Sequence, residues 1–335
     1  MMPELHPFAK FIAILGRGKT LSRSLTLIEA DEAMGMIIDE IALPEQLGAF
    51  LMLQRFQEET PEEVAGFVKA IKSRLDLPAV IPKVDIDWSS YAGKRRQLPW
   101  FVLSALLLSQ NGVRVFMHGT EGHTPGRVYT RETLEALGYP VTETLNEAAQ
   151  ALDARNFAYV PLEGLSPKMR DLIELRPIFG LRTPVHTISR MINPFDAPAM
   201  LQGIFHRGFL ETHTHAGKYL GQPNMAVFRG EGGEIERRAN KPTDVQVLRD
   251  GDISMERWPR LTADPRQPVD EEMDVQRLAA LWRGEIEDEY GQASVCGTLA
   301  IALKLLGKAD SIEDADELAV SMWQSRDTAY FAKVA

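Results

Sequence analysis

The first 75 or so residues of the chain carry apolar side chains at helical spacing, interrupted by polar residues that typically cap helices. Thr26 precedes Glu29 in a capping box, in which each side chain satisfies a free backbone amide at the start of a helix. Thr60 and Glu63 repeat this arrangement, with Pro61 at a first helical position where its missing N–H costs nothing. The pattern predicts three consecutive helices, at residues 26–40, 43–57 and 60–74.

Beyond residue 77, short runs rich in β-branched and aromatic residues alternate with longer helical stretches. The short runs predict strands at 113–117, 157–162, 201–206 and 224–228, and residues 77–87 predict a linker that enters a strand. The longer stretches predict helices at 97–110, 130–138, 166–175, 210–220, 269–282, 292–306 and 311–325. Alternating strands and helices predict a mostly parallel sheet with helices on both faces. Residues 250–268 are the least regular part of the chain and predict no element.

Length and composition are those of a globular protein with two domains. The chain has 335 residues, of which 44% are apolar and 25% charged. Its one cysteine, Cys296, lies in an apolar helical stretch and indicates a core residue in a reducing compartment. The N-terminus does not read as a signal peptide, and the longest apolar run, Trp100–Leu108, is too short to span a bilayer. We therefore expect a cytoplasmic protein that does not interact with membranes.

The net charge of −10 is unevenly distributed along the chain. Residues 261–335 hold 7 Lys/Arg and 15 Asp/Glu, so the first 260 residues are nearly neutral. Two segments are locally basic: 8–28 has four cations and no acid, and 88–131 has six cations and one acid. Global acidity excludes a protein coated in positive charge, but it leaves room for a local basic groove that attracts an anion.

The segment 89–97 (SSYAGKRRQ) combines the residue types that bind phosphate. It follows an expected strand and precedes an expected helix, and ligands of parallel sheets bind at the carboxyl ends of the strands. The three adjacent cations Lys94, Arg95 and Arg96 would reinforce the positive end of that helix. Tyr91 and Trp88 could stack on a nucleobase. A solvated helix start without a ligand is the alternative for the same segment.

Two other motifs give weaker evidence of a binding site. Gly16-Arg-Gly-Lys-Thr20 suggests a nucleotide P-loop, but Ala13 stands where that motif requires glycine, which leaves a flexible loop able to contact phosphate. Glu211, His213 and His215 suggest a metal cluster. Residues two apart on a helix point in different directions, so a surface helix is the preferred interpretation.

Most of the chain resembles the anthranilate phosphoribosyltransferase family. The resemblance is carried by the helical segment 25–71 (LTLIEADEAMG to EEVAGFVKAI) and by the later landmarks VRVFMHG, TLEALG, GLRT and LLGKADSIEDADELA. It implies an α plus α/β fold of the nucleoside phosphorylase and phosphoribosyltransferase type. The small helical domain would be residues 1–77, joined by a helical segment near 166–195, and the α/β domain residues 78–335. It also implies a homodimer formed through the helical domain.

The sequence departs from the family at three catalytic landmarks. The family's diphosphate loop, Gly-Thr-Gly-Gly-Asp, is replaced by 87–93 (DWSSYAG), so side chains stand where backbone must approach the ligand. The lysine of the family's Lys-His-Gly-Asn is Met117 here, next to His118. The family's magnesium-binding Asp-Glu pair is Gly233-Glu234, which leaves one carboxylate for a hard cation. Arg176 keeps the position that binds the acceptor's carboxylate, and Arg182 belongs to the retained GLRT turn.

These departures are similar to those of a divergent branch of the family, the YbiB-like proteins, which shares GRGK, SYxGxR/KxQ, HG followed by RVxT, and the HT motif at 186–187. That branch is linked to sequence-independent nucleic-acid binding. The resemblance implies a basic groove between the domains that binds a single strand. Its candidate phosphate-binding or base-stacking residues are Arg17, Lys19, Arg23, Tyr91, Lys94, Arg95, Arg96, Arg127, Arg176 and Arg182.

Two other functions remain open. The chain could be a glycosyl- or phosphoribosyltransferase acting on an unidentified substrate, with His118 near the reacting centre, Arg176 holding an acceptor and Glu234 holding magnesium. Anthranilate phosphoribosyl transfer itself is disfavoured by the three departures, and no cofactor is expected outside this alternative. The acidic C-terminal face could instead serve as a protein-interaction scaffold.

Overall fold

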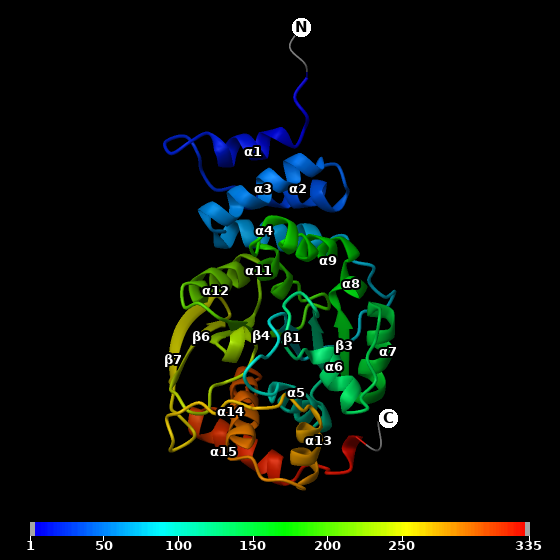
Figure 1. Ribbon diagram of the computed structural model, residues 1–335, viewed down its shortest axis with the longest axis vertical. Coiled ribbons are helices and arrows are strands. Elements are labelled where there is room, and N and C mark those ends of the chain that lie inside the picture. The colour runs from blue at the N-terminus through cyan, green and yellow to red at the C-terminus, as the bar shows by residue number, and fades with distance from the viewer. Residues whose placement is uncertain (1–3, 332–335) are drawn as a thin grey trace.

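The computed structural model describes residues 4–331, which form a helical bundle stacked on an α/β domain (Figure 1). The bundle begins with α1 (Ala9–Gly16), α2 (Leu27–Ile38), α3 (Pro44–Gln57) and α4 (Pro61–Lys72). Both predicted capping boxes are present: Thr26 N–H donates to Glu29 Oε2 at 2.9 Å, and Thr60 N–H donates to Glu63 Oε2 at 2.9 Å. Local sequence therefore sets where α2 and α4 begin.

One sheet of seven strands forms the centre of the α/β domain, in the order β3-β2-β1-β4-β5-β6-β7. The strands are β1 (Ile86–Ser90), β2 (Val115–Gly119), β3 (Phe157–Pro161), β4 (Ala199–Ile204), β5 (Asn224–Arg229), β6 (Thr243–Arg249) and β7 (Asp252–Trp258). The first five are parallel, whereas β6 and β7 pair antiparallel. The expected mostly parallel sheet is confirmed.

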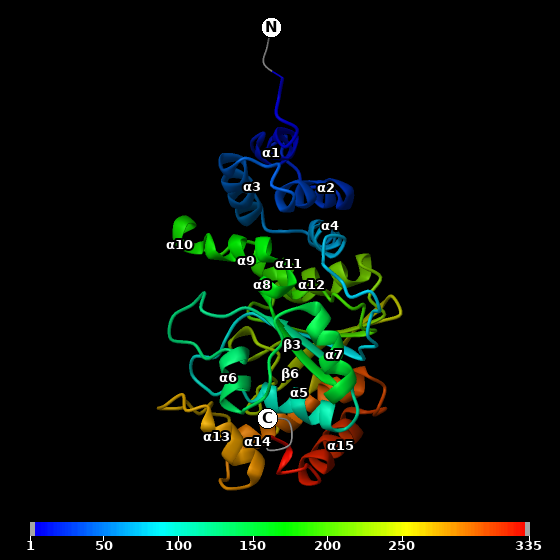
Figure 2. The same ribbon diagram turned by 90° about the vertical axis from the view of Figure 1, so that its right-hand side faces the viewer.

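Helices cover both faces of this sheet (Figures 1 and 2). On the side of the helical bundle they are α7 (Leu145–Arg155), α8 (Leu162–Leu165), α9 (Pro167–Glu174), α10 (Arg176–Phe179), α11 (Val185–Arg190) and α12 (Phe209–Tyr219). On the opposite side of the sheet the helices are α5 (Phe101–Gln110), α6 (Thr130–Ala136), α13 (Gln276–Arg283), α14 (Glu289–Leu305) and α15 (Ile312–Gln324). A 3-10 turn, η1 (Glu231–Gly233), follows β5.

Two hydrophobic cores result from the alternation of side chains along the strands. Leu201 and Ala226 face the core shared with α5, α14 and α15. Their neighbours Met200 and Met225 face the second core, which is continuous with the helical bundle. Successive side chains of a strand point to opposite faces, so strands buried on both faces contribute to both cores. The sheet is thereby held between the two layers, and its edge forms a rigid base for the loops.

The β6–β7 hairpin occupies part of the region that predicted no regular element. Asp250 and Gly251 form its turn with φ angles of +48° and +90°, the backbone that a tight Asp-Gly hairpin requires. The helix expected from residue 269 instead begins at Gln276. Pro268 and Asp270 are held by hydrogen bonds to the segment 96–98, which keeps this stretch extended.

Candidate functional site

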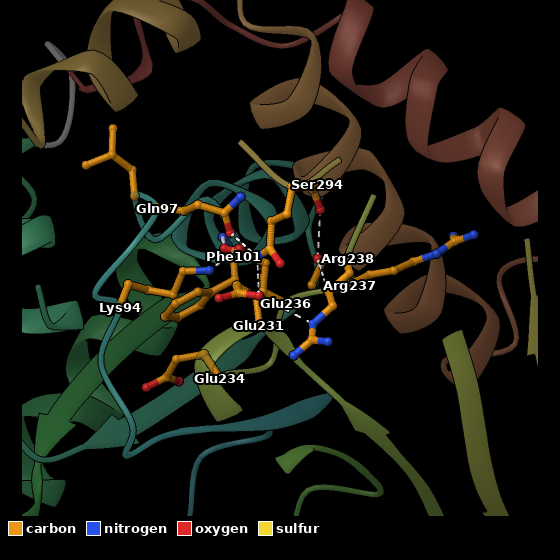
Figure 3. A network of polar contacts seen from close by, with 12 residues as sticks. Lys94, Gln97, Phe101, Glu231, Glu234, Glu236, Arg237, Arg238 and Ser294 are labelled. Carbon is orange, nitrogen blue, oxygen red and sulfur yellow. Dashed lines mark hydrogen bonds and ion pairs between the residues drawn. The ribbon is translucent and has the colours of Figure 1, made fainter. Parts of the chain in front are cut away.

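A loop that follows β1 is held by Glu234, which follows η1. Glu234 Oε1 accepts hydrogen bonds from the backbone N–H groups of Ala92 at 2.6 Å and of Gly93 at 2.5 Å. Gly93 has a φ of +67°, and such a turn aims successive amides at one point, as in anion-binding nests. The Glu234 side chain, fully buried, is labelled in Figure 3. A side chain of the protein therefore occupies a nest that is suited to an anion.

Close backbone packing fixes Glu234 in this position. A Cβ atom on Gly203, at the end of β4, would lie 2.4 Å from the Glu234 carbonyl oxygen. A Cβ atom on Gly230, just after β5, would lie 1.6 Å from the same oxygen. Only glycine permits these approaches. The two glycines thus let the 230–236 turn lie against the sheet edge with its carboxyl group aimed at the loop after β1.

Lys94 lies in the interior, contrary to the expectation that it contacts phosphate. Its side chain is 1% exposed and pairs with Glu236, which is 0% exposed (Figure 3). Glu236 Oε2 also accepts the backbone N–H of Phe101 at 3.0 Å, at the first residue of α5. Burial raises the pKa of Glu236, and the Lys94 ammonium opposes that shift. The pair anchors the 91–96 loop, and this ammonium is already neutralised by a carboxylate.

Tyr91, Trp88 and His118 are also buried, so neither aromatic side chain of β1 and its loop is available to stack on a base. Tyr91 Oη lies 2.7 Å from His118 Nδ1, and His118 Nε2 lies 3.4 Å from Asp87 Oδ1. Burial, followed by the charge of Asp87, raises the pKa of Tyr91 well above its usual value. This chain of buried groups ties β1 to β2, and His118 is 0% exposed.

Four arginines gather where the loops after β1, β2 and β4 meet α10 and α11. Arg127 Nη1 donates to the carbonyl oxygens of Ala92 at 2.7 Å and Gly93 at 3.1 Å. Arg176 Nη1 donates to Thr124 Oγ1 at 2.6 Å, and Arg182 Nη2 donates to the same oxygen at 3.2 Å. The fourth, Arg190, donates to the carbonyl oxygens of Gly203 at 2.9 Å and Gly233 at 3.0 Å. We call these four residues the arginine cluster.

The arginine cluster has no ion pair with a carboxylate among the described residues. Its guanidinium groups contact neutral oxygens and lie close enough to perturb one another. Partial burial, followed by the charges of Arg176, Arg127 and Arg190, lowers the pKa of Arg182 to about 10. Glu234 acts on Arg190 from beyond ion-pair distance, and the other three guanidinium groups supply positive charge that favours the binding of an anion.

A pair of histidines lies within the arginine cluster. The rings of His123 and His186 are 5.2 Å apart between centroids, and neither ring makes a hydrogen bond of good geometry. Burial, with the neighbouring His186 and arginines, lowers the pKa of His123 to about 2. Burial, with Arg182 and Arg190, lowers the pKa of His186 to about 3, although the nearby Thr183 backbone opposes the shift. Both imidazoles are therefore neutral at physiological pH.

The remaining expected phosphate ligands divide into two groups. Arg95 and Arg96 are exposed two and three residues after Gly93, whose carbonyl oxygen Arg127 contacts, and the Arg96 carbonyl oxygen accepts the N–H of Asp270. Arg17 and Lys19 are exposed on the α1–α2 connection, and Arg23 is exposed further along it, where it lines a cavity with Tyr219 of α12. Arg23 is also paired in a two-point contact with Glu29. This second group does not meet the arginine cluster within one chain.

Residue-by-residue reading of the sequence missed Arg190, His123 and the role of Glu234 as an internal hydrogen-bond acceptor. Arg190 lies four residues after His186, and on a helix this spacing places the two side chains on one face. That spacing was the available signal. The surface helix preferred for residues 211–215 is wrong at His213, which is buried with its Nδ1 3.2 Å from Gln202 Oε1.

The side chains at this edge do not fit a magnesium ion. In the part of the chain that the structure describes, no group of three His, Cys, Asp or Glu side chains could hold a metal. Glu234 is the one carboxyl group at the position expected from the family resemblance, and Oε1 of that group already accepts two N–H bonds. A hard cation prefers several oxygen ligands, which this turn does not offer.

A helical bundle set against the carboxyl edge of a mostly parallel sheet defines a protein of the phosphoribosyltransferase fold class. Family models of a glycosyl transferase family match the chain, with the helical bundle domain at residues 9–74 and the a/b domain at residues 101–325. An anthranilate phosphoribosyltransferase of Methylocella silvestris is 30% identical over 243 residues, covering 72% of this chain and 68% of the relative. The chain belongs to this glycosyl transferase family.

Solved structures show the same fold at low sequence identity. The anthranilate phosphoribosyltransferase of Thermus thermophilus matches with a TM-score of 0.81 at 20% identity, over 98% of both chains. The Saccharomyces cerevisiae enzyme in complex with PRPP and Mg matches with a TM-score of 0.76 at 13% identity, over 98% of this chain and 97% of that one. Another relative, an uncharacterized protein of Aquifex aeolicus, is 29% identical over 236 residues, which are 69% of this chain and 71% of the relative. Among residues 4–331, every helix is too short or too polar to cross a bilayer.

Proposed function

We propose that this chain binds single-stranded nucleic acid, without sequence preference, through phosphate groups that contact the arginine cluster. The observation that carries the proposal is the convergence of four guanidinium groups without an ion-paired carboxylate among the described residues. Arginine binds phosphate oxygens through charge-assisted hydrogen bonds, and these supply most of the affinity of a sequence-independent protein.

The arrangement of the cations favours a chain of phosphates over a single one. Arg95 and Arg96 are exposed and extend the positive surface along the loop after β1, while Arg176 and Arg182 extend it toward the helical bundle. An extended polyanion contacts such a row of cations and releases bound counterions from each phosphate. The net charge of −10 does not oppose this contact, because much of the acidic excess lies in residues 261–335.

A titration of a labelled single-stranded oligonucleotide, followed by fluorescence anisotropy at several salt concentrations, tests this function. We expect binding that weakens steeply with salt, with a log–log slope of about −0.7 for each phosphate contacted. Duplex DNA of equal length serves as the comparison for strand preference. If the labelled strand shows no change in anisotropy even at low salt, the proposal fails.

The second candidate function is transfer of a glycosyl or phosphoribosyl group. Membership of the family and the presence of Arg176 at the acceptor position favour it. Glu234 opposes it, because its side chain fills the amide nest at the position where the family resemblance implies a diphosphate. Heat released on mixing the wild-type protein with phosphoribosyl diphosphate and magnesium, measured by calorimetry, would favour the transferase.

Replacing Glu234 tests whether this side chain is what closes the nest. Glu234→Ala frees the two amides of Ala92 and Gly93, so we expect the variant to bind inorganic diphosphate when the wild-type protein does not. Glu231→Ala, which removes an acid from the same turn but not from the nest, is the control. Equal calorimetric behaviour of all three proteins would show that Glu234 does not limit access.

We also infer that two copies of the chain pair through the helical bundle, as the family resemblance implies. Large apolar side chains are exposed there: Ile28 is 77% exposed, Leu21 70% and Leu43 49%. Exposed apolar surface of this kind is typical of protein–protein contacts. Light scattering should therefore give twice the chain mass of 37.5 kDa, and Ile28→Glu should lower the mass toward one chain.

A further inference from the structure

A cavity of about 190 Å³ lies beneath α11, between the helical bundle and the carboxyl end of β4. Arg55 and Glu59 line it from the α3–α4 region, His186 and Arg190 line it from α11, and Phe205 and His206 line it from the segment after β4. Figure 1 places α11 and α12 between α4 and the sheet, and residues of both helices line this cavity. We call it the α11 cavity, and the phosphate-binding role proposed above does not account for it.

The walls of the α11 cavity combine two phenylalanine side chains, Phe205 and Phe209, with several polar groups. Phe205 is 49% exposed although it is a large apolar side chain, and its ring packs edge-on to His206 at 4.8 Å between centroids. His186 is 8% exposed, and both of its ring nitrogens lack a hydrogen bond of good geometry. The Thr183 backbone is its one polar neighbour, and a polar group so deeply buried with so poor a partner favours a ligand or solvent, because an unsatisfied group costs free energy.

We propose that the α11 cavity takes one nucleobase, which stacks on Phe205 and receives hydrogen bonds at its edge from the polar wall. This inference rests on the proposed function and adds a base-binding subsite to it. Bases of single strands are commonly splayed out, stacked on an aromatic side chain and bound along their edges. The polar wall suits a base edge because Arg190 donates, neutral His186 both donates and accepts, and Glu59 supplies oxygen atoms.

The size and position of the α11 cavity favour a single base over other ligands. Drug-sized ligands fill cavities of roughly 300–1,000 Å³, so a cavity of about 190 Å³ suits one heteroaromatic ring. Arg182 and Arg190 belong both to the cavity wall and to the arginine cluster. A strand whose phosphates contact the arginine cluster therefore has its bases next to the cavity opening. A bare phosphate would make no stacking contact with Phe205, whose ring already contacts His206 and Arg229, and it would meet the Glu59 side chain.

The test compares an intact oligonucleotide with a strand of the same length in which every base is missing. Wild-type protein should bind the intact strand about tenfold more tightly, since stacking one base contributes on that order. Phe205→Ala should remove most of this difference, and it should leave the affinity for the abasic strand unchanged. Tyr219→Ala, which removes a 48% exposed aromatic of α12 outside the cavity, should preserve the difference.

Each outcome decides between the two proposals. Equal affinity of wild-type protein for intact and abasic strands, or equal losses in Phe205→Ala and Tyr219→Ala, would overturn the nucleobase subsite and leave phosphate binding intact. If neither strand binds at low salt, the proposed function fails, and a free nucleoside monophosphate then tests the cavity alone. If wild-type protein binds the monophosphate and Phe205→Ala abolishes this binding, the result supports the nucleobase subsite, with a free nucleotide as its ligand. If the monophosphate does not bind, the nucleobase subsite is overturned. Unchanged thermal unfolding of both variants confirms that they are folded.

Discussion

Arg176→Gln combined with Arg182→Gln should weaken the binding of a single strand about 100-fold at moderate salt. Each guanidinium contact with a charged phosphate is worth about 1.5 kcal/mol or more, and two such contacts are lost. The log–log salt slope should become shallower by about 1.4, because each single-strand phosphate contact contributes about 0.7. Anisotropy titrations of the variant and the wild-type protein at four or more salt concentrations measure both quantities.

A matched control separates the effect of losing the arginine cluster from the effect of changing the net charge. Arg260→Gln combined with Lys308→Gln removes the same two charges from exposed positions after β7 and between α14 and α15. This control should keep the wild-type salt slope, because distant exposed charges are largely screened. Arg176 also holds the loop after β2 through His123 and Thr124, so unfolding curves must accompany the titrations. An unchanged salt slope in the Arg176 and Arg182 variant would refute the role of the arginine cluster.

Lys94→Met should lower the free energy of unfolding by about 3–5 kcal/mol at neutral pH. The substitution leaves Glu236 buried without its cation, and breaking one side of a buried pair is costly for this reason. Glu236 also caps the first residue of α5, so the loss extends to the start of that helix. Urea unfolding followed by tryptophan fluorescence measures the change, and Arg95→Met, at the exposed neighbour, should stay within about 0.5 kcal/mol of wild type.

The loss of stability in Lys94→Met should depend on pH in a defined direction. Burial already raises the pKa of Glu236, and removing Lys94 removes the group that opposes this shift. A carboxyl group whose folded pKa is raised binds its proton more tightly in the folded state. Its contribution is therefore fully present below the unfolded pKa and is lost as pH rises through the folded pKa. The deficit should be smaller at pH 5 than at pH 8, and an equal deficit at both would contradict the account.

Local sequence was sufficient to predict the elements whose boundaries depend on neighbouring residues. Thr26 and Thr60 cap α2 and α4 through contacts three residues away, so their sequence neighbours carry the information. The β6–β7 hairpin was missed although Asp250-Gly251 is a hairpin turn signal, because the three prolines that follow, Pro259, Pro265 and Pro268, suggested an irregular segment. The start of α13 depends on bonds from Pro268 and Asp270 to residues 96–98, which no local pattern contains.

The candidate site could be predicted only in part, because burial and pairing are long-range properties. Lys94 stands beside Arg95 in the sequence and looks equivalent to it, yet its partner Glu236 is 142 residues away. The arginine cluster likewise forms when Arg176 reaches Thr124, 52 residues earlier in the chain. Sequence motifs supplied Arg127, Arg176 and Arg182 as candidates. Only the folded structure identified Arg190 as a member of the arginine cluster. It also showed that Tyr91 is buried and therefore cannot stack on a base.

The nest filled by Glu234 changes how the stability of this chain relates to its ligands. A loop that needs a diphosphate to complete its hydrogen bonds is stabilised when the ligand binds, because a ligand of the native state shifts the unfolding equilibrium by mass action. In this chain a residue of the same polypeptide completes the loop, at a local concentration that dilution cannot lower. The hydrogen bonds that order this loop are therefore made within the chain when it folds.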